Sequence, residues 1–256
     1  MQPGVDEMAA MTHEEQRAHA MSRATFYAYL SAVFGQRPSS ELVGLIRDGT
    51  IIRLVAGFPS ACKHLVNLQR VASLDGGARL ELDLAVDYTR LLVGPGPDYL
   101  PPYESVHRKV GASLATASLT TRSLGTKGGP APLWGDAAVA VGQCYAEAGF
   151  VLADSVESVP DHIGTELDFL RVLCLAEAQA WEVGDVAAAG IARSRQRDFL
   201  EDHLLAWVPD YCAVVEGRAN HPFYSTMAAL TIEFLDEEAE EMERPDQVRA
   251  VAGGES

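Results

Sequence analysis

The stretch 157-ESVPDHIGTELDFLRVLC-174 sets a proline, an aspartate and a histidine directly before a strongly apolar run. On a helical wheel at about 100° per residue, the run forms one apolar stripe made of Ile163, Leu167, Leu170 and Cys174. A flank beside this stripe carries His162, Glu166, Phe169 and Leu173. The pattern predicts a helix with one buried face, which we expect to cover residues 158–184.

The start of this helix carries capping signals. Ser158 and Asp161 have the Ser-x-x-Asp spacing of a capping box, and Pro160 stands in the first turn, where its missing N–H costs nothing. His162 and Glu166 are one helical turn apart, so we expect their side chains to pair at the edge of the buried face. These signals fit a structural role, and by themselves they do not require a functional site.

Helical periodicity also dominates the rest of the chain. Further helices are expected at 12–35, 40–48, after Pro59, and at 78–93, 133–149, 185–202, 203–217 and 222–242. Thr12 and Glu15 form a capping box, Pro222 opens the last helix, and Pro209 fits only within a first turn. Alternating strand patterns are absent from the sequence. We therefore predict an all-α fold, a single-domain helical bundle of about ten helices.

A long Pro/Gly-rich loop interrupts the middle of this bundle. The stretch 94-GPGPDYLPPYESVHRKVG-111 has four prolines within residues 94–102, which forbid a helix there. Residues 112–131 are rich in Ser, Thr and Gly. We expect the helical domain to span 12–242 with a weak internal boundary near 108–131, and residues 1–11 and 243–256 to be flexible.

The charge of the chain restricts its partners. The sequence has 20 Lys+Arg against 36 Asp+Glu, a formal net charge of −16. Such a surface repels phosphate backbones, so we expect no nucleic-acid binding and favour a partner that carries positive charge. The N-terminus lacks the pattern of a secretory signal, and no long apolar run exists, so we expect a cytoplasmic protein without stable membrane insertion.

Metal and catalytic motifs are weak. The four cysteines, Cys62, Cys144, Cys174 and Cys212, include no Cys-x-x-Cys pair, which disfavours a metal site or a disulfide framework. Di-iron bundles need two Glu-x-x-His motifs, and the chain does not have that pair. No Gly-x-Ser-x-Gly is present, and the glycines of 125-GTKGGP-130 do not follow a buried strand. An all-α enzyme, or a binder of a nucleotide or other small molecule, that uses the Asp161–His162 pair stays open as the alternative.

Three blocks of the sequence resemble the TorD/DmsD/NarJ family of redox-enzyme maturation chaperones. The blocks are YTRLLVGPGP…LPPYESV at 88–106, VPDHIGTELDFL at 159–170 and FLEDHLLAWVPDY…HPFYSTMAALTIEFLDEE at 199–238. The resemblance covers most of residues 20–240. One departure is Ser158, which stands where the family usually has a glutamate, with Glu157 one position earlier.

The resemblance implies an all-helical cytoplasmic chaperone without catalytic activity or a cofactor of its own. Its partner would be the precursor of a molybdoenzyme catalytic subunit with an Arg-Arg signal peptide, held until the molybdopterin is inserted. The client-binding residues implied by position are Tyr88, Leu91, Pro101, Pro102, Tyr103, Glu104, Ser105, Pro160, Asp161 and His162. The long connection at 108–131 would permit either a monomer or an exchanged-element dimer.

The chemistry of such a leader, the N-terminal signal peptide of the client, agrees with these residues. A leader has a basic segment followed by an apolar one, so its binder should offer carboxylates beside apolar groups. Glu104, Asp161 and Glu166 are the expected carboxylates. The candidate apolar contacts are Tyr99, Leu100, Tyr103 and Phe169.

Overall fold

The computed structural model describes residues 11–74, 77–108, 136–151 and 159–243. Its α-helices are α1 (His13–Gly35), α2 (Ser40–Arg47), α3 (Thr50–Leu54), α4 (Pro59–Ala72), α5 (Ala78–Tyr88), α6 (Glu104–His107), α7 (Asp136–Glu147), α8 (Ile163–Glu182), α9 (Val186–Asp202), α10 (Val208–Arg218) and α11 (Pro222–Glu243). A π-helix, η1 (Thr89–Val93), follows α5, and a 3-10 helix, η4 (Leu204–Ala206), precedes α10. These ranges contain no strand, so the predicted all-α fold is confirmed.

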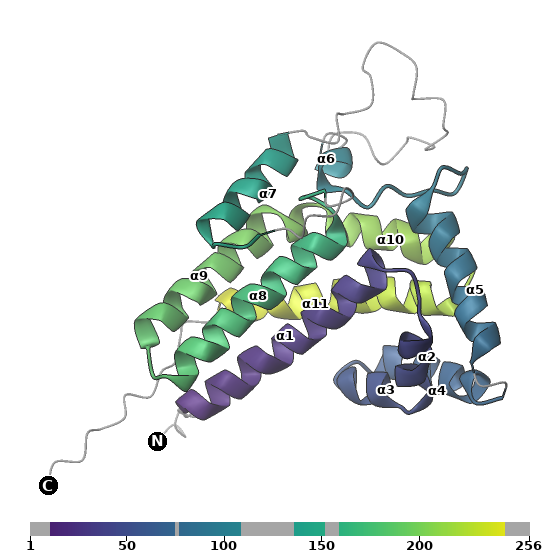
Figure 1. The fold of residues 1–256 in the computed structure, drawn as a ribbon, viewed down its shortest axis with the longest axis horizontal. Coiled ribbons are helices and arrows are strands. Elements are labelled where there is room, and N and C mark those ends of the chain that lie inside the picture. Colours follow the sequence, from purple (N-terminus) through teal and green to yellow (C-terminus); the bar gives the residue numbers. More distant parts are fainter. Residues whose placement is uncertain (1–10, 75–76, 109–135, 152–158, 244–256) are drawn as a thin grey trace, which may run out of the picture.

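The centre of the molecule is an antiparallel pair of long helices, α1 and α8 (Figure 1). The ring of His13 at the start of α1 lies 5.3 Å from that of Trp181 near the end of α8. At the opposite ends, the Ser31 hydroxyl donates to the Gly164 carbonyl at 2.8 Å. Helix α9 packs on the other side of α8, while α2, α3 and α4 form a separate group near the end of α1.

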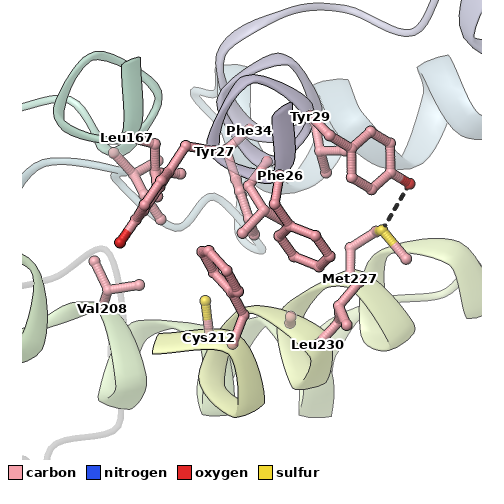
Figure 2. Packing of buried hydrophobic residues seen from close by; sticks show 14 of the residues in the cluster. Phe26, Tyr27, Tyr29, Phe34, Leu167, Val208, Cys212, Met227 and Leu230 are labelled. Atoms are coloured by element: carbon pink, nitrogen blue, oxygen red, sulfur yellow. Dashed lines mark hydrogen bonds between the residues drawn. The ribbon is translucent and has the colours of Figure 1, made fainter. Parts of the chain in front are cut away.

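Helix α1 begins at the predicted capping box, in which the Glu15 N–H donates to the Thr12 hydroxyl. Its apolar face meets α10 and α11 (Figure 2). Phe26 stacks on Phe234 of α11 with ring centroids 4.3 Å apart, and the Tyr29 hydroxyl donates to the sulfur of Met227 at 3.0 Å. This burial of aromatic surface is the main term that holds the bundle together.

Glycines allow α1 and α8 to approach closely. A Cβ added at Gly164 would lie 2.8 Å from the Cα of Gly35, closer than real atoms come. The two backbones therefore cross at a point where neither helix has a side chain. This crossing sets the position of the start of α8, where the Pro-Asp-His segment lies.

A buried ionic cluster around Arg23, in the middle of α1, ties four helices together. Arg23 of α1 donates to both carboxylate oxygens of Glu238 of α11, at 2.8 and 2.7 Å. The same guanidinium contacts Glu177 of α8 at 3.2 Å and Gln196 of α9 at 2.7 Å. All four side chains are buried, so each charge is balanced by a partner rather than by water.

Several predicted boundaries need correction or lie outside the described residues. Helix α8 begins at Ile163 rather than near 158, and the expected helix at 203–217 is divided into η4 and α10. Pro209 lies in the first turn of α10 and Pro222 opens α11, as predicted. The expected flexible ends, the 125–130 glycine loop and the Ser158 cap fall outside the described ranges, as does nearly all of the 108–131 boundary.

Candidate functional site

The proline-rich loop and the Pro-Asp-His segment are joined by an antiparallel bridge between Tyr103 and His162. The Glu104 N–H donates to the Asp161 carbonyl at 2.9 Å, and the Ile163 N–H donates to the Pro102 carbonyl at 3.0 Å. Prolines favour extended backbone in the residue before them. In extended backbone the N–H and C=O groups of the loop can form hydrogen bonds with another segment. The bridge also explains the late start of α8, since the preceding residues pair with the loop.

Asp161 caps α6 rather than α8, which corrects the predicted capping role. Its carboxylate oxygen Oδ2 accepts the Ser105 N–H at 2.8 Å, while its backbone carbonyl accepts the Glu104 N–H. The side chain is fully buried. Asp161 therefore holds the first turn of α6 against the start of α8, through both its main chain and its side chain.

His162 is the residue that caps α8. Its ring nitrogen Nδ1 accepts the Gly164 N–H at 3.0 Å, and its ring lies edge-on to that of Tyr103 with centroids 5.3 Å apart. Burial lowers the pKa of His162 to about 4, so the ring is neutral near pH 7. The expected pair of His162 with Glu166 is wrong, because one Glu166 oxygen accepts from Trp207 and the other has no hydrogen bond to His162.

Glu166 points inward instead. It is fully buried, and its oxygen Oε2 accepts the indole N–H of Trp207 at 3.1 Å. Burial, followed by the nearby charge of Glu104, raises the pKa of Glu166 well above its usual range. The Glu166 carboxyl is thus held toward its neutral form, in which it can also donate a hydrogen bond.

Glu104, the first residue of α6, is also fully buried. His203, which follows α9, places Nδ1 3.0 Å from one carboxylate oxygen, and Arg108 places Nη1 2.8 Å from the other. Glu104, Asp161 and Glu166 will be called the carboxyl cluster. Burial, followed by the nearby charges of Glu104 and Asp161 among other causes, raises the pKa of Glu166, so the three carboxyls influence one another.

The walls of this region come from aromatic residues that sequence reasoning did not assign to the site. His107 makes a hydrogen bond with the Pro101 carbonyl through Nε2 at 2.8 Å, and its ring stacks on that of Trp207. The ring of Tyr211 meets the His107 ring edge-on. Phe199, His203, Trp207 and Tyr211 recur at a spacing of four along 199-FLEDHLLAWVPDY-211. In a continuous helix this spacing would gather them toward one face, although the structure divides the stretch into α9, η4 and α10. The spacing was the signal that could have identified them.

The remaining predicted residues support the site from the core. Tyr88 and Leu91 are buried, with the Tyr88 hydroxyl donating to the Phe34 carbonyl at 3.4 Å. Leu100 and Phe169, expected as possible peptide contacts, are also core residues. Pro102 and Pro160 are buried next to the bridge, and the Pro160 carbonyl accepts the Tyr145 hydroxyl at 2.9 Å. Pro101, Tyr103 and His162 are partly exposed at its surface.

The geometry offers little for catalysis by an Asp161–His162 pair. Asp161 accepts from Ser105 on one side, while His162 accepts from Gly164 on the other, so the two side chains serve different backbone groups. Within the described ranges, no group of three His, Cys, Asp or Glu side chains is arranged to hold a metal ion. None of the helices described is both long enough and apolar enough to cross a membrane.

Comparison with known proteins assigns the chain to a family. The family described as nitrate reductase delta subunit matches residues 56–213, more than half of the chain. This chain belongs to the nitrate reductase delta subunit family. The resemblance to the TorD/DmsD/NarJ chaperones is thereby confirmed, and the matched range of the delta subunit family includes both residues of the Tyr103–His162 bridge.

Relatives within the delta subunit family are named as chaperones. The chain is 23% identical over 222 residues to the chaperone protein TorD of Vibrio cholerae, covering 84% of this chain and 90% of that protein. A selenate reductase assembly chaperone protein of Thauera selenatis is 45% identical over 60 residues, 23% of this chain and 30% of the relative. A perchlorate reductase assembly chaperone protein of Dechloromonas aromatica is 32% identical over 98 residues, 38% of this chain and 43% of the relative.

Proposed function

We propose that this protein is a cytoplasmic chaperone that binds the twin-arginine leader, the apo form, or both, of a molybdopterin-containing reductase subunit during assembly. Family membership and the names of its relatives support the assembly role. The observation that carries the binding site is the Tyr103–His162 bridge, which joins the proline-rich loop to the Pro-Asp-His segment.

The bridge region has the two properties that a leader binder needs. The partly exposed rings of Tyr103 and His162 provide an apolar surface, and the carboxyl cluster lies beneath it. The net charge of −16 draws a basic leader toward the protein over longer distances. An exposed arginine–carboxylate pair contributes only about 0.2–1 kcal/mol, so apolar contact must provide most of the affinity.

Co-purification from the native host tests the assembly role. We expect a single large reductase subunit that carries an Arg-Arg leader, recovered less efficiently once the leader is deleted. Equal recovery of the leaderless subunit would instead indicate an adaptor for the mature protein. Turnover of a small substrate without any such partner would support the enzyme alternative.

The double variant Tyr103→Ala/His162→Asn tests the site. Asparagine keeps a good helix cap, so the fold should survive while both rings are removed. We expect leader affinity to fall about tenfold or more, with unchanged far-UV circular dichroism. His64→Asn, at an exposed position on α4, is the matched control. Unchanged leader binding by a folded Tyr103/His162 variant would remove the bridge from the proposal.

A further inference from the structure

Glu104 has two basic partners, His203 and Arg108, whose side chains differ in exposure. The His203 side chain is 5% exposed and approaches from the interior. The Arg108 side chain is 40% exposed and approaches from the surface, with Nη1 2.8 Å from Oε1 of a carboxylate that has no exposed area. Arg108 is thus the group that stands between this buried carboxylate and the solvent.

Arg108 is weakly held compared with Arg23, which also pairs with a buried glutamate. Arg23 is 5% exposed, binds both oxygens of Glu238 and has further partners on two more helices. Arg108 follows a four-residue helix, and among the described residues its ion pair is with Glu104. Because its side chain is partly solvated, the guanidinium can leave Glu104 without being stranded in the interior. Glu104 cannot leave as easily, since its backbone N–H is bonded to Asp161.

The carboxyl cluster also has unused hydrogen-bonding capacity. Three buried oxygens have no partner among the described residues: Oγ of Ser105, Oδ1 of Asp161 and Oε1 of Glu166. Polar atoms without a partner are rare in the interior of a protein, and Oδ1 of Asp161 is an acceptor that can take a further donor. A guanidinium brings five N–H donors in a planar fork, more than any other side chain.

We propose that Arg108 occupies the position of a client arginine, and that an incoming leader guanidinium replaces it on Glu104. The inference rests on the proposed leader binding and adds the residue that receives the arginine and the one that competes with it. In the free protein Arg108 neutralises Glu104. In the complex the client arginine takes this place, and Arg108 turns into the solvent. The leader arginine can bind Glu104 only while Arg108 is away from it. Arg108 therefore lowers the apparent affinity for a leader in proportion to the fraction of time that it holds Glu104.

A purely structural Arg108 predicts the opposite sign. Glu104 and Arg108 have the spacing of four that stabilises a helix, so loss of a structural arginine would loosen α6 and weaken binding. The decisive variant is Arg108→Gln. Its control is Arg79→Gln, which also removes one positive charge from an ion pair between residues four apart. In that control pair, between Arg79 and Asp83 on α5, the carboxylate is 45% exposed.

The probe is a synthetic leader peptide with two adjacent arginines. Its sequence is that of the leader of the subunit recovered by co-purification, and its affinity is measured by titration calorimetry. We expect Arg108→Gln to bind about three- to tenfold more tightly than Arg79→Gln, with the gain lost for a leader whose arginines are both glutamine. In the Glu104→Gln background, Arg108→Gln should give no gain. Equal or weaker binding by Arg108→Gln than by Arg79→Gln overturns the inference.

The design separates this inference from the proposed function. If the wild-type protein binds the leader but Arg108→Gln behaves like Arg79→Gln, leader binding stands and the competition by Arg108 is wrong. If the wild type recovers no client or binds no leader, the proposed function fails and the inference fails with it. Should Glu104→Gln not fold, the comparison of Arg108→Gln with Arg79→Gln still decides the sign.

Discussion

At the residue scale, two glutamates that look alike in the sequence have different buried partners. Glu238 is buried against Arg23, which balances its charge with two hydrogen bonds. Glu166 is buried against the indole of Trp207 and near the charge of Glu104, so its pKa is raised well above its usual range. Burial without a cation favours the neutral carboxyl, whereas burial with one favours the carboxylate.

The variant Glu166→Gln tests this difference. Glutamine has the shape of the neutral carboxyl and keeps an acceptor for Trp207, so unfolding free energy at pH 5 should change by no more than about 1 kcal/mol. Above pH 4.5 the unfolded wild type loses a proton that the folded state keeps, and its stability falls. Urea titrations from pH 4 to 7 should therefore show Glu166→Gln becoming progressively more stable than the wild type.

The opposite pH trend would mean that Glu166 is charged in the folded state. Glu41→Gln, at an exposed position on α2, controls for the general effect of removing one negative charge from an acidic protein. A difference between wild type and Glu166→Gln that does not change with pH would also contradict the raised pKa.

At the element scale, the bridge determines where helices begin. Residues before Ile163 pair with the loop at Pro102 and Glu104, so they cannot take part in α8. His162 then provides the cap, and Asp161 provides the cap of α6. The two helix starts are consequently coupled, and a change at either one moves the surface on which Tyr103 and His162 lie.

The crossing of α1 and α8 fixes this coupled region in space, and Gly164→Ala tests it. The added methyl would meet the backbone of Gly35 at 2.8 Å, so the helices must separate. We expect a loss of about 1–3 kcal/mol in unfolding free energy, by analogy with overpacked cores. Thermal and chemical denaturation measure it, with weaker leader binding as a second readout.

Gly190→Ala is the matched control for that variant. Gly190 lies within α9, and a Cβ there would meet no atom within 4 Å. Alanine is the better helix former by about 0.5–1 kcal/mol, so this variant should be slightly more stable than the wild type. Equal effects of the two substitutions would contradict the close approach of α1 and α8.

At the scale of the whole molecule, the ionic cluster around Arg23 connects α1, α8, α9 and α11 across large separations in sequence. Removing the arginine takes from Glu238 the cation that binds it, and leaves Glu177 with Arg193 at 3.9 Å. The variant Arg23→Met should lower unfolding free energy by about 3–5 kcal/mol, the usual effect of stranding a buried charge.

Chemical denaturation measures this loss, and Arg17→Met provides the comparison. Arg17 lies on the same helix, but its pair with Glu14 is exposed to solvent, so its removal should leave stability nearly unchanged. A small effect of Arg23→Met would show that the helices are held by apolar packing alone.

The sequence by itself determined those features that depend on neighbours within about one helical turn. The capping box of Thr12 and Glu15, the first-turn positions of Pro209 and Pro222, and the buried stripe from Ile163 to Cys174 are all present as predicted. Each follows from backbone hydrogen bonds, side-chain caps or helical periodicity, which involve residues close together in the chain. The three motif blocks were likewise sufficient to indicate the family.

Only the tertiary structure decided which of these residues are charged, capped or exposed. His203 reaches Glu104 across a separation of 99 residues, and Trp207 reaches Glu166 across 41. The start of α8 depends on a loop distant in sequence, and the neutrality of Glu166 depends on its removal from water. Desolvation and long-range pairing are properties of the packed molecule, so no local pattern in the chain could have specified them.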